Sequence, residues 1–141
     1  MIVLDTSGII AAYNVREAEH KTCHQILTTA TEPFVVSPLV LAEVDYLATK
    51  YLGVDGAVTV LTELAQLASV AHLDNEDLRD AIAMLSRYVD LDIGLTDAAN
   101  VVIAGRYKTT KLLTLDDHYR VVRPLHGDAF TLPPFDEETA S

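Results

Sequence analysis

The chain has 141 residues, half of them hydrophobic and 22% charged, which is enough for one domain with a substantial core and excludes disorder of the whole chain. The net charge of −11 argues at first against a nucleic-acid partner, because phosphate binding usually calls for a basic surface. The single cysteine excludes an internal disulfide, and the sequence has no run of about 18 apolar residues. The short N-terminal apolar run, interrupted by Asp5 and without preceding basic residues, leads us to expect no signal peptide. We therefore expect a cytoplasmic protein that does not enter a membrane.

The first half of the chain alternates short apolar runs with helical patterns. In order, we expect a strand at 2–4, a helix through 13, a helix at 17–29, a strand at 34–36, a helix from 38 to 53 and a helix at 57–68. Ser7 is the candidate cap of the first helix. Ser37 and Pro38 form a strong helix start, since Ser favours the cap position and Pro the first helical position.

The second half continues the alternation. We expect a strand at 70–73, a helix from 75 to about 88, a helix at 97–107 and a strand at 111–115, with Thr96 as the cap of the last helix. Alternating strands and helices predict an α/β fold in which a mainly parallel central sheet lies between helices. We expect one domain over 1–135 and a mobile acidic tail over 136–141.

Two aspartates follow predicted strands directly. Asp5 ends the strand at 2–4, and Asp116 ends the strand at 111–115. Ligands of parallel sheets bind beyond the carboxyl ends of the strands, so both side chains can reach one crevice. Each aspartate on its own is equally compatible with a turn or a helix cap.

Two further acids lie on predicted helices. Glu43 stands between Val40 and Leu47 at the margin of an apolar stripe, where a carboxylate is costly to bury unless it is paired or binds a metal. The alternative is a glutamate at the rim that extends into water. Asp97 opens a helix that is apolar nearly all round, so its side chain is expected to face an enclosed site, although the helix dipole alone also favours Asp there.

Four carboxylates in one crevice would repel one another unless a cation joined them. Hard oxygen ligands suit Mg²⁺ or Mn²⁺, which can activate water and stabilise charge at phosphorus. The pattern therefore indicates hydrolysis of a phosphodiester.

Basic residues concentrate in one segment in spite of the negative net charge. Residues 101–123 hold five cations against two acids, and the other 118 residues hold five basic and nineteen acidic side chains. We take the five as possible RNA-binding residues: Arg106, Lys108, Lys111, Arg120 and Arg123. Solvated cations at helix ends and in loops are the alternative interpretation.

Four motifs together resemble a known family. They are VLDTS at 3–7, SPLVLAEVDYL at 37–47, GLTDAAN at 94–100 and LLTLD at 112–116. In order and spacing they are similar to those of the PIN-domain endoribonucleases, in particular the VapC-type toxins of bacterial toxin–antitoxin pairs. The resemblance covers essentially the whole chain.

The resemblance implies a three-layer α/β/α PIN-like domain that cuts structured RNA such as tRNA or rRNA. It implies that Asp5, Glu43, Asp97 and Asp116 are catalytic and hold Mg²⁺, with Mn²⁺ as a possible substitute. It further implies a homodimer inhibited by a VapB-type antitoxin. Thr6 and Ser7 would support the site, and Asp117 could share the role of Asp116.

Other interpretations stay open on the residues alone. Val3-Leu4-Asp5-Thr6 is similar to the nucleophile motif of haloacid-dehalogenase-like phosphatases, but Ser7 stands where that chemistry needs a second Asp. A non-catalytic, metal-binding regulatory module is the other alternative. His118 could reach RNA or shuttle a proton, although a plain loop histidine is the commoner case.

Overall fold

The computed structural model describes residues 1–136. Its elements are β1 (Ile2–Leu4), α1 (Thr6–Tyr13), α2 (His20–Thr29), β2 (Phe34–Val36), α3 (Pro38–Leu67), β3 (Ala68–Val70), α4 (Asn75–Arg87), η1 (Val89–Leu91), α5 (Leu95–Arg106), β4 (Leu112–Leu113) and η2 (Asp117–Arg120), where η marks a short 3₁₀ helix. No helix in this part of the chain is both long and apolar enough to cross a membrane.

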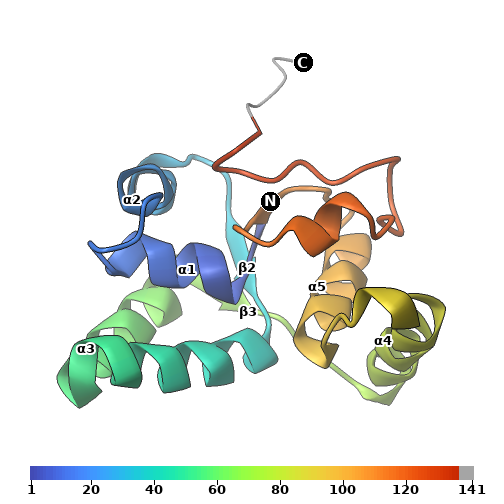
Figure 1. The fold of residues 1–141 in the computed structure, drawn as a ribbon, viewed down its shortest axis with the longest axis horizontal. Coiled ribbons are helices and arrows are strands. Elements are labelled where there is room, and N and C mark those ends of the chain that lie inside the picture. Colours follow the sequence, from blue (N-terminus) through green and yellow to red (C-terminus); the bar gives the residue numbers. More distant parts are fainter. Residues whose placement is uncertain (137–141) are drawn as a thin grey trace.

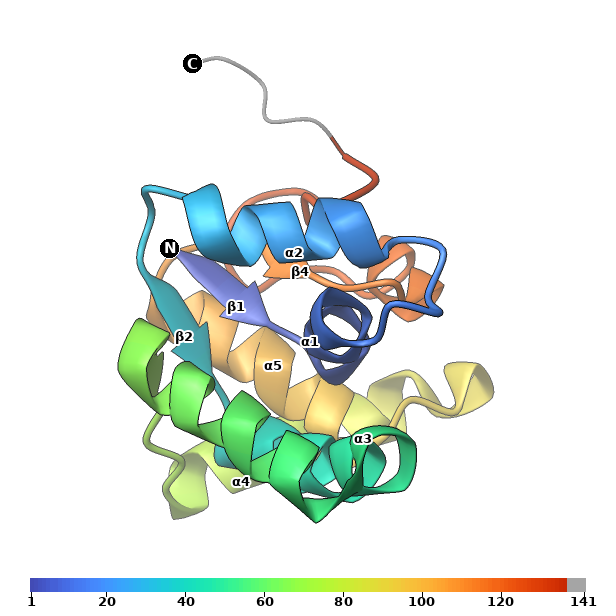
Figure 2. The same ribbon diagram turned by 90° about the vertical axis from the view of Figure 1, so that its left-hand side faces the viewer.

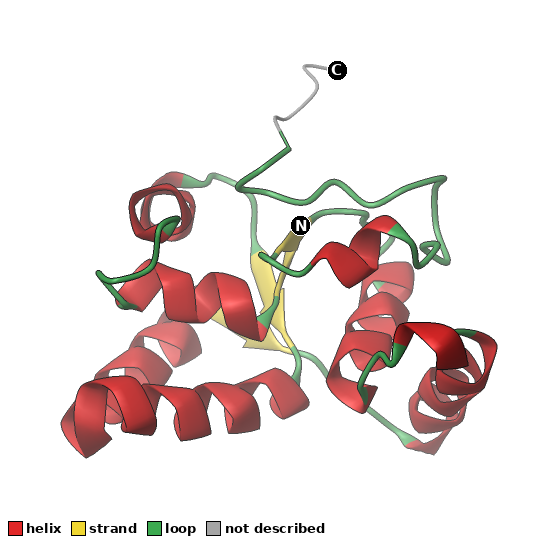
Figure 3. Cartoon of the chain, viewed as in Figure 1, coloured by secondary structure: helices red, strands yellow, loops and turns green. Residues whose placement is uncertain are grey.

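The four strands form one sheet in the order β3-β2-β1-β4, and every pair is parallel. The sheet lies in the middle of the molecule (Figure 3). Helices α1, α2 and α3 cover one face, and α4 and α5 cover the other (Figures 1 and 2). The predicted three-layer α/β/α architecture is confirmed.

Successive side chains along a strand point to opposite faces of the sheet, and here both sets are apolar, which explains why helices cover both faces. Ile2 and Leu4 pack into the core that β1 shares with α1, α2 and α3, whereas Val3 packs into the core formed with α4 and α5. Phe34 and Val35 on β2 divide in the same way. A strand buried on both faces needs apolar residues at every position, which is why these strands read as continuous apolar runs.

The long helix α3 is interrupted where the sequence predicted a stop. Gly53 has a φ of 76° and a ψ of 175°, a backbone conformation that lies outside the helical region and favours glycine. The helix resumes directly after Gly53 rather than at residue 57, so α3 consists of two helical segments joined at a kink.

Two predicted helix caps are wrong. Helix α1 begins at Thr6 with Asp5 in the cap position, and α5 begins at Leu95 with Gly94 in the cap position. The hydroxyl groups of Ser7 and Thr96 instead form hydrogen bonds with residues distant in sequence. Local cap preferences are worth only about 1 kcal/mol, so these tertiary contacts prevail.

Other element bounds also differ from prediction. Strand β3 follows α3 without a loop and occupies 68–70 rather than 70–73, because Ala68 pairs with Phe34 and Val70 with Val36. Helix α2 begins at His20 instead of residue 17, and β4 is shorter than the predicted 111–115. These shifts leave the order of the elements unchanged.

The chain after η2 returns along the sheet. Lys111 and Thr131 form a parallel bridge beside β4. Asp136, assigned by sequence to the tail, accepts hydrogen bonds from the Leu132 N–H at 2.8 Å and from Arg120 at 2.8 Å. The rest of the predicted tail, 137–141, lies outside the described residues.

Candidate active site

The sheet order places the first and last strands side by side. The chain proceeds from β1 to β2 and β3 on one side, and β4 then joins the free side of β1. Such a reversal of direction opens a crevice beyond the carboxyl ends of the two strands. Asp5 follows β1 and Asp116 lies just beyond β4, so the predicted pair of strand-end aspartates is brought together here.

Asp5 is held by donors from four other segments. Thr114 Oγ1 donates to Asp5 Oδ2 at 2.6 Å, and Ser7 Oγ donates to the same oxygen at 3.2 Å. Asn100 Nδ2 donates to Asp5 Oδ1 at 3.1 Å, and the Tyr119 hydroxyl lies 3.5 Å from that oxygen. With only 4% of its surface exposed, the carboxylate is fixed in one orientation.

Burial and neighbouring carboxylates raise the pKa values of two of the acids, Asp5 and Asp97. Burial raises the pKa of the Asp5 carboxyl to about 6, against the hydrogen bond from Thr114, and the carboxylates of Asp97 and Asp116 add to the rise. Burial and the nearby Asp116 carboxylate also raise the pKa of Asp97. The pKa of Tyr119 is driven well above 10 by burial and these acids, so its hydroxyl stays protonated and can donate.

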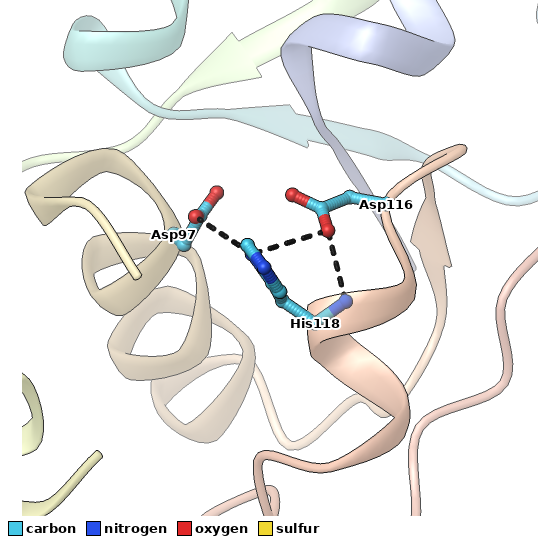
Figure 4. Close-up of side chains that lie close together, drawn as sticks. All are labelled: Asp97, Asp116 and His118. Carbon is cyan, nitrogen blue, oxygen red and sulfur yellow. Dashed lines mark hydrogen bonds and ion pairs between the residues drawn. The ribbon is translucent and has the colours of Figure 1, made fainter. Parts of the chain in front are cut away.

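Asp97 and Asp116 lie on either side of a histidine. Tyr119 donates to Asp97 Oδ1 at 3.2 Å, and the backbone N–H of His118 donates to Asp116 Oδ1 at 2.8 Å. Figure 4 shows the His118 ring between the two carboxylates. Its Nδ1 lies 3.3 Å from Asp116 Oδ1 and 4.0 Å from Asp97 Oδ2.

Glu43 reaches the site from α3, but not for the reason the sequence suggested. Its side chain is exposed rather than buried, so no desolvation cost requires a metal there. Thr6 Oγ1 donates to Glu43 Oε1 at 2.6 Å, and Thr96 Oγ1 donates to Oε2 at 3.0 Å. The two hydroxyl groups aim the carboxylate toward the same crevice.

These side chains surround a pocket of about 290 Å³. Its lining consists of Asp5, Thr6, Ser7, Ile10, Glu17, Glu43, Leu47, Tyr51, Asp97, Leu115 and Asp116. All four acids singled out from the sequence are therefore brought together, as are Thr6 and Ser7. Asp117 begins η2, is exposed and does not line the pocket.

Sequence reasoning missed several residues of the site. Asn100 and Thr114 both contact Asp5, and Tyr119 contacts Asp5 and Asp97. Glu17 adds a fifth carboxylate to the lining. Asn100 and Thr114 stand inside two of the four motifs, and that position was the one signal in the sequence that could have found them.

The five basic candidates do not line the pocket. Arg106 ends α5, the helix that begins near Asp97, and pairs with Asp77. Lys111 precedes β4 and pairs with Glu32 at 2.7 Å. Both therefore lie at the far ends of elements whose near ends form the site, while Arg120 ends η2, which directly follows Asp116.

The donor set fits a divalent cation. None of the described residues that line the pocket is Lys or Arg, so no protein cation balances the carboxylates. Ligand atoms from Asp97, Asp116 and His118 lie within 4.8 Å of one another. Carboxylate oxygens in such a cluster suit Mg²⁺ or Mn²⁺.

A family profile and a related protein sequence indicate the same family. The PIN-domain family profile matches residues 2–124. Ribonuclease VapC26 of Mycobacterium tuberculosis is 38% identical over 135 residues, which are 94% of this chain and all of that protein.

Solved structures agree on the fold. The crystal structure of Mycobacterium tuberculosis VapC20, described as a sarcin-ricin loop cleaving toxin, superposes with a TM-score of 0.76 at 21% identity, over 83% of this chain and 91% of that one. VapBC2 from Rickettsia felis, bound to a DNA fragment from its promoter, gives a TM-score of 0.66 at 19% identity, over 89% of this chain and 96% of that one.

Proposed function

The chain belongs to the PIN-domain family, in its VapC-type branch, and we propose that it is a metal-dependent endoribonuclease that cuts structured RNA as the toxin of a toxin–antitoxin pair. The observation that carries the proposal is the convergence of Asp5, Glu43, Asp97 and Asp116 on one pocket at the carboxyl edge of the sheet. These residues are 111 positions apart at the extremes, so only the fold brings them together.

The proposed roles follow from burial and hydrogen bonding. Asp5, Asp97 and Asp116 would hold the cation, and Glu43 at the more exposed side would hold it directly or through water. Such a cation, when bound, lowers the pKa of water and stabilises charge on phosphate oxygens. Asn100, Thr114 and Tyr119 orient Asp5, while Thr6 and Thr96 orient Glu43.

The proposed substrate is an RNA stem-loop from tRNA or rRNA. The relative VapC20 is described as cleaving the sarcin-ricin loop, so an rRNA stem-loop is one candidate to test here. Arg120 and Arg123 are favoured over Arg106, Lys108 and Lys111 as RNA-binding residues, because η2 and the residues after it follow Asp116 directly. Binding would combine phosphate contacts from these cations with contacts to unpaired bases.

Regulation is proposed from the relatives in complexes. The Rickettsia felis structure is of a VapBC assembly, and by analogy a VapB-type partner would inhibit this chain. We propose that the chain acts as a homodimer in the cytoplasm.

The phosphatase interpretation is not supported. Ser7 stands where that chemistry needs a second acid, and its hydroxyl donates a hydrogen bond to Asp5.

The direct experiment incubates the purified protein with tRNA and with rRNA stem-loops in Mg²⁺, in Mn²⁺ and in EDTA. We expect cleavage with either cation, none in EDTA, and a loss of at least about 100-fold for Asp5→Asn and Glu43→Gln. Asp45→Asn is the matched control, because Asp45 is an exposed acid two residues from Glu43 that does not line the pocket. Cleavage that persists in EDTA, or equal cleavage by Asp5→Asn, would refute the proposal.

A further inference from the structure

His118 occupies a place in the site that neither the motifs nor the proposed acidic set accounts for. It belongs to η2, whose first turn is fixed by the hydrogen bond from the His118 N–H to Asp116 Oδ1 at 2.8 Å. This bond holds the histidine beside Asp116, with its ring between Asp116 and Asp97 (Figure 4).

The ring nitrogen that faces the acids has no hydrogen-bond partner. His118 Nδ1 is shielded from solvent and forms no hydrogen bond within residues 1–136. Asp116 Oδ1 is 3.3 Å away, which is close enough for an ion pair but not aligned for a hydrogen bond. A buried polar atom without a partner is energetically costly, so Nδ1 indicates a missing ligand.

The distances match those between ligands of one metal ion. Two ligand atoms at right angles on a cation, each about 2.1 Å away from it, lie about 3 Å apart, and atoms on opposite sides lie about 4 Å apart. The separations of Nδ1 from Asp116 Oδ1 and Asp97 Oδ2, 3.3 and 4.0 Å, fall within this range.

We propose that His118 Nδ1 binds the same divalent cation as Asp97 and Asp116, and that the site therefore prefers Mn²⁺ to Mg²⁺. This inference rests on the metal dependence proposed above. Binding through Nδ1 requires the neutral imidazole that carries its proton on Nε2. Imidazole nitrogen suits transition metals, whereas Mg²⁺ is held by oxygen ligands and keeps most of its waters.

The test measures metal binding rather than cleavage. Mn²⁺ is titrated into the full chain and followed by electron paramagnetic resonance, Mg²⁺ affinity is obtained by competition, and pulsed spectra are examined for nitrogen coupling to Mn²⁺. The variants are His118→Ala and His118→Gln, with His126→Ala as the matched control, since His126 is exposed and lies outside the pocket.

We expect nitrogen coupling in the parent and in His126→Ala, and its loss in both His118 variants. Mn²⁺ affinity should fall about tenfold in those variants, while Mg²⁺ affinity changes less than about threefold. Should His118→Ala fail to fold by circular dichroism, His118→Gln carries the same comparison.

Two results overturn the inference: Mn²⁺ bound without nitrogen coupling in the parent, or an unchanged Mn²⁺-to-Mg²⁺ affinity ratio in the variants. Either result leaves the proposed nuclease intact if the parent still cuts RNA in Mg²⁺. Absence of any cation binding together with absence of cleavage would remove both.

Discussion

At the scale of single residues, Asp5 is deeply buried and lies near the carboxylates of Asp97 and Asp116. Its pKa in the folded, metal-free protein is about 6, against 3.8 as its ordinary value. Between these two values the folded state binds more protons at Asp5 than the unfolded state does. The contribution of Asp5 to stability is therefore greatest at acidic pH and is lost as the pH rises through 6.

This linkage predicts how Asp5→Asn behaves in EDTA. The variant has no carboxyl to ionise, so its free energy of unfolding relative to the parent should increase by about 2 kcal/mol between pH 4.5 and pH 7.5. Urea unfolding at the two pH values measures the difference. A relative stability independent of pH, or one that changes in the opposite direction, would contradict the assigned burial of an acid at this position.

Tyr119 is a positioning residue, because its hydroxyl contacts two of the acids. It donates to Asp97 Oδ1 at 3.2 Å and lies 3.5 Å from Asp5 Oδ1. Tyr119→Phe keeps the ring and its edge-on packing against Phe130. We expect Mn²⁺ affinity to fall about tenfold while the thermal unfolding midpoint changes by only a few degrees. Calorimetry of both quantities separates positioning from packing, and unchanged affinity would count against the role.

The sequence revealed some site residues and hid others for physical reasons. Asp5 and Asp116 follow apolar runs directly, so the rule for strand ends located them. Nothing in the neighbouring sequence marks Asn100, Thr114 and Tyr119 as site residues. Their hydrogen-bond partners in the site lie about 20 to 110 positions away along the chain. Glu43 was selected from its place beside an apolar stripe, yet its side chain is exposed and held by Thr6 and Thr96.

At the scale of elements, the close approach of α1 to β4 sets the geometry of the site. A side-chain carbon added at Gly8 would lie 2.4 Å from the carbonyl oxygen of Leu113, so only glycine allows this contact. Helix α1 carries Thr6 and Ser7, and β4 leads into Thr114 and Asp116. The absence of a side chain at Gly8 therefore allows the two segments to lie this close, and the hydrogen bond from Leu115 N–H to Ser7 Oγ at 2.9 Å joins them.

Gly8→Ala should destabilise the protein by about 1–3 kcal/mol and lower RNA cleavage more than stability alone explains, because backbone must move. Gly94→Ala is the control, since an added carbon there meets nothing within 4 Å. Urea unfolding and cleavage rates are measured for both. A Gly8→Ala protein as stable and active as Gly94→Ala would show that the approach is not required.

Element order was predictable where apolar patterns were long, and element ends were not. The strand at 34–36 and the interruption at Gly53 were both expected from the sequence and are found. The start of β3 was misplaced by two residues, because Ala68 and Ser69 follow a helix without any turn signal. The start of β3 is set by its pairing with β2, and no pattern in the neighbouring sequence indicates it.

At the scale of the whole molecule, an acidic protein is proposed to bind a polyanion. The net charge of −11 opposes RNA, so the few cations near the pocket should matter strongly. Arg120→Gln combined with Arg123→Gln should weaken RNA binding about tenfold or more and reduce the slope of log affinity against log salt by about 1 to 2.

Lys108→Gln is the matched control, because Lys108 follows the far end of α5. Filter binding with Asp97→Asn protein in EDTA, over a range of salt concentrations, measures affinity without cleavage. Equal losses in the control and in the double variant would mean that RNA contacts are not concentrated after Asp116.

The four converging acids are proposed to form the centre of an RNA-cutting enzyme. The most direct test is to express the parent and Asp97→Asn in cells and to sequence the 5′ ends of all RNA fragments. We predict new 5′ ends at one or a few stem-loop positions with the parent, together with growth arrest, and neither with Asp97→Asn. The same 5′ ends from both proteins, or no new ends from a parent that arrests growth, would contradict the account.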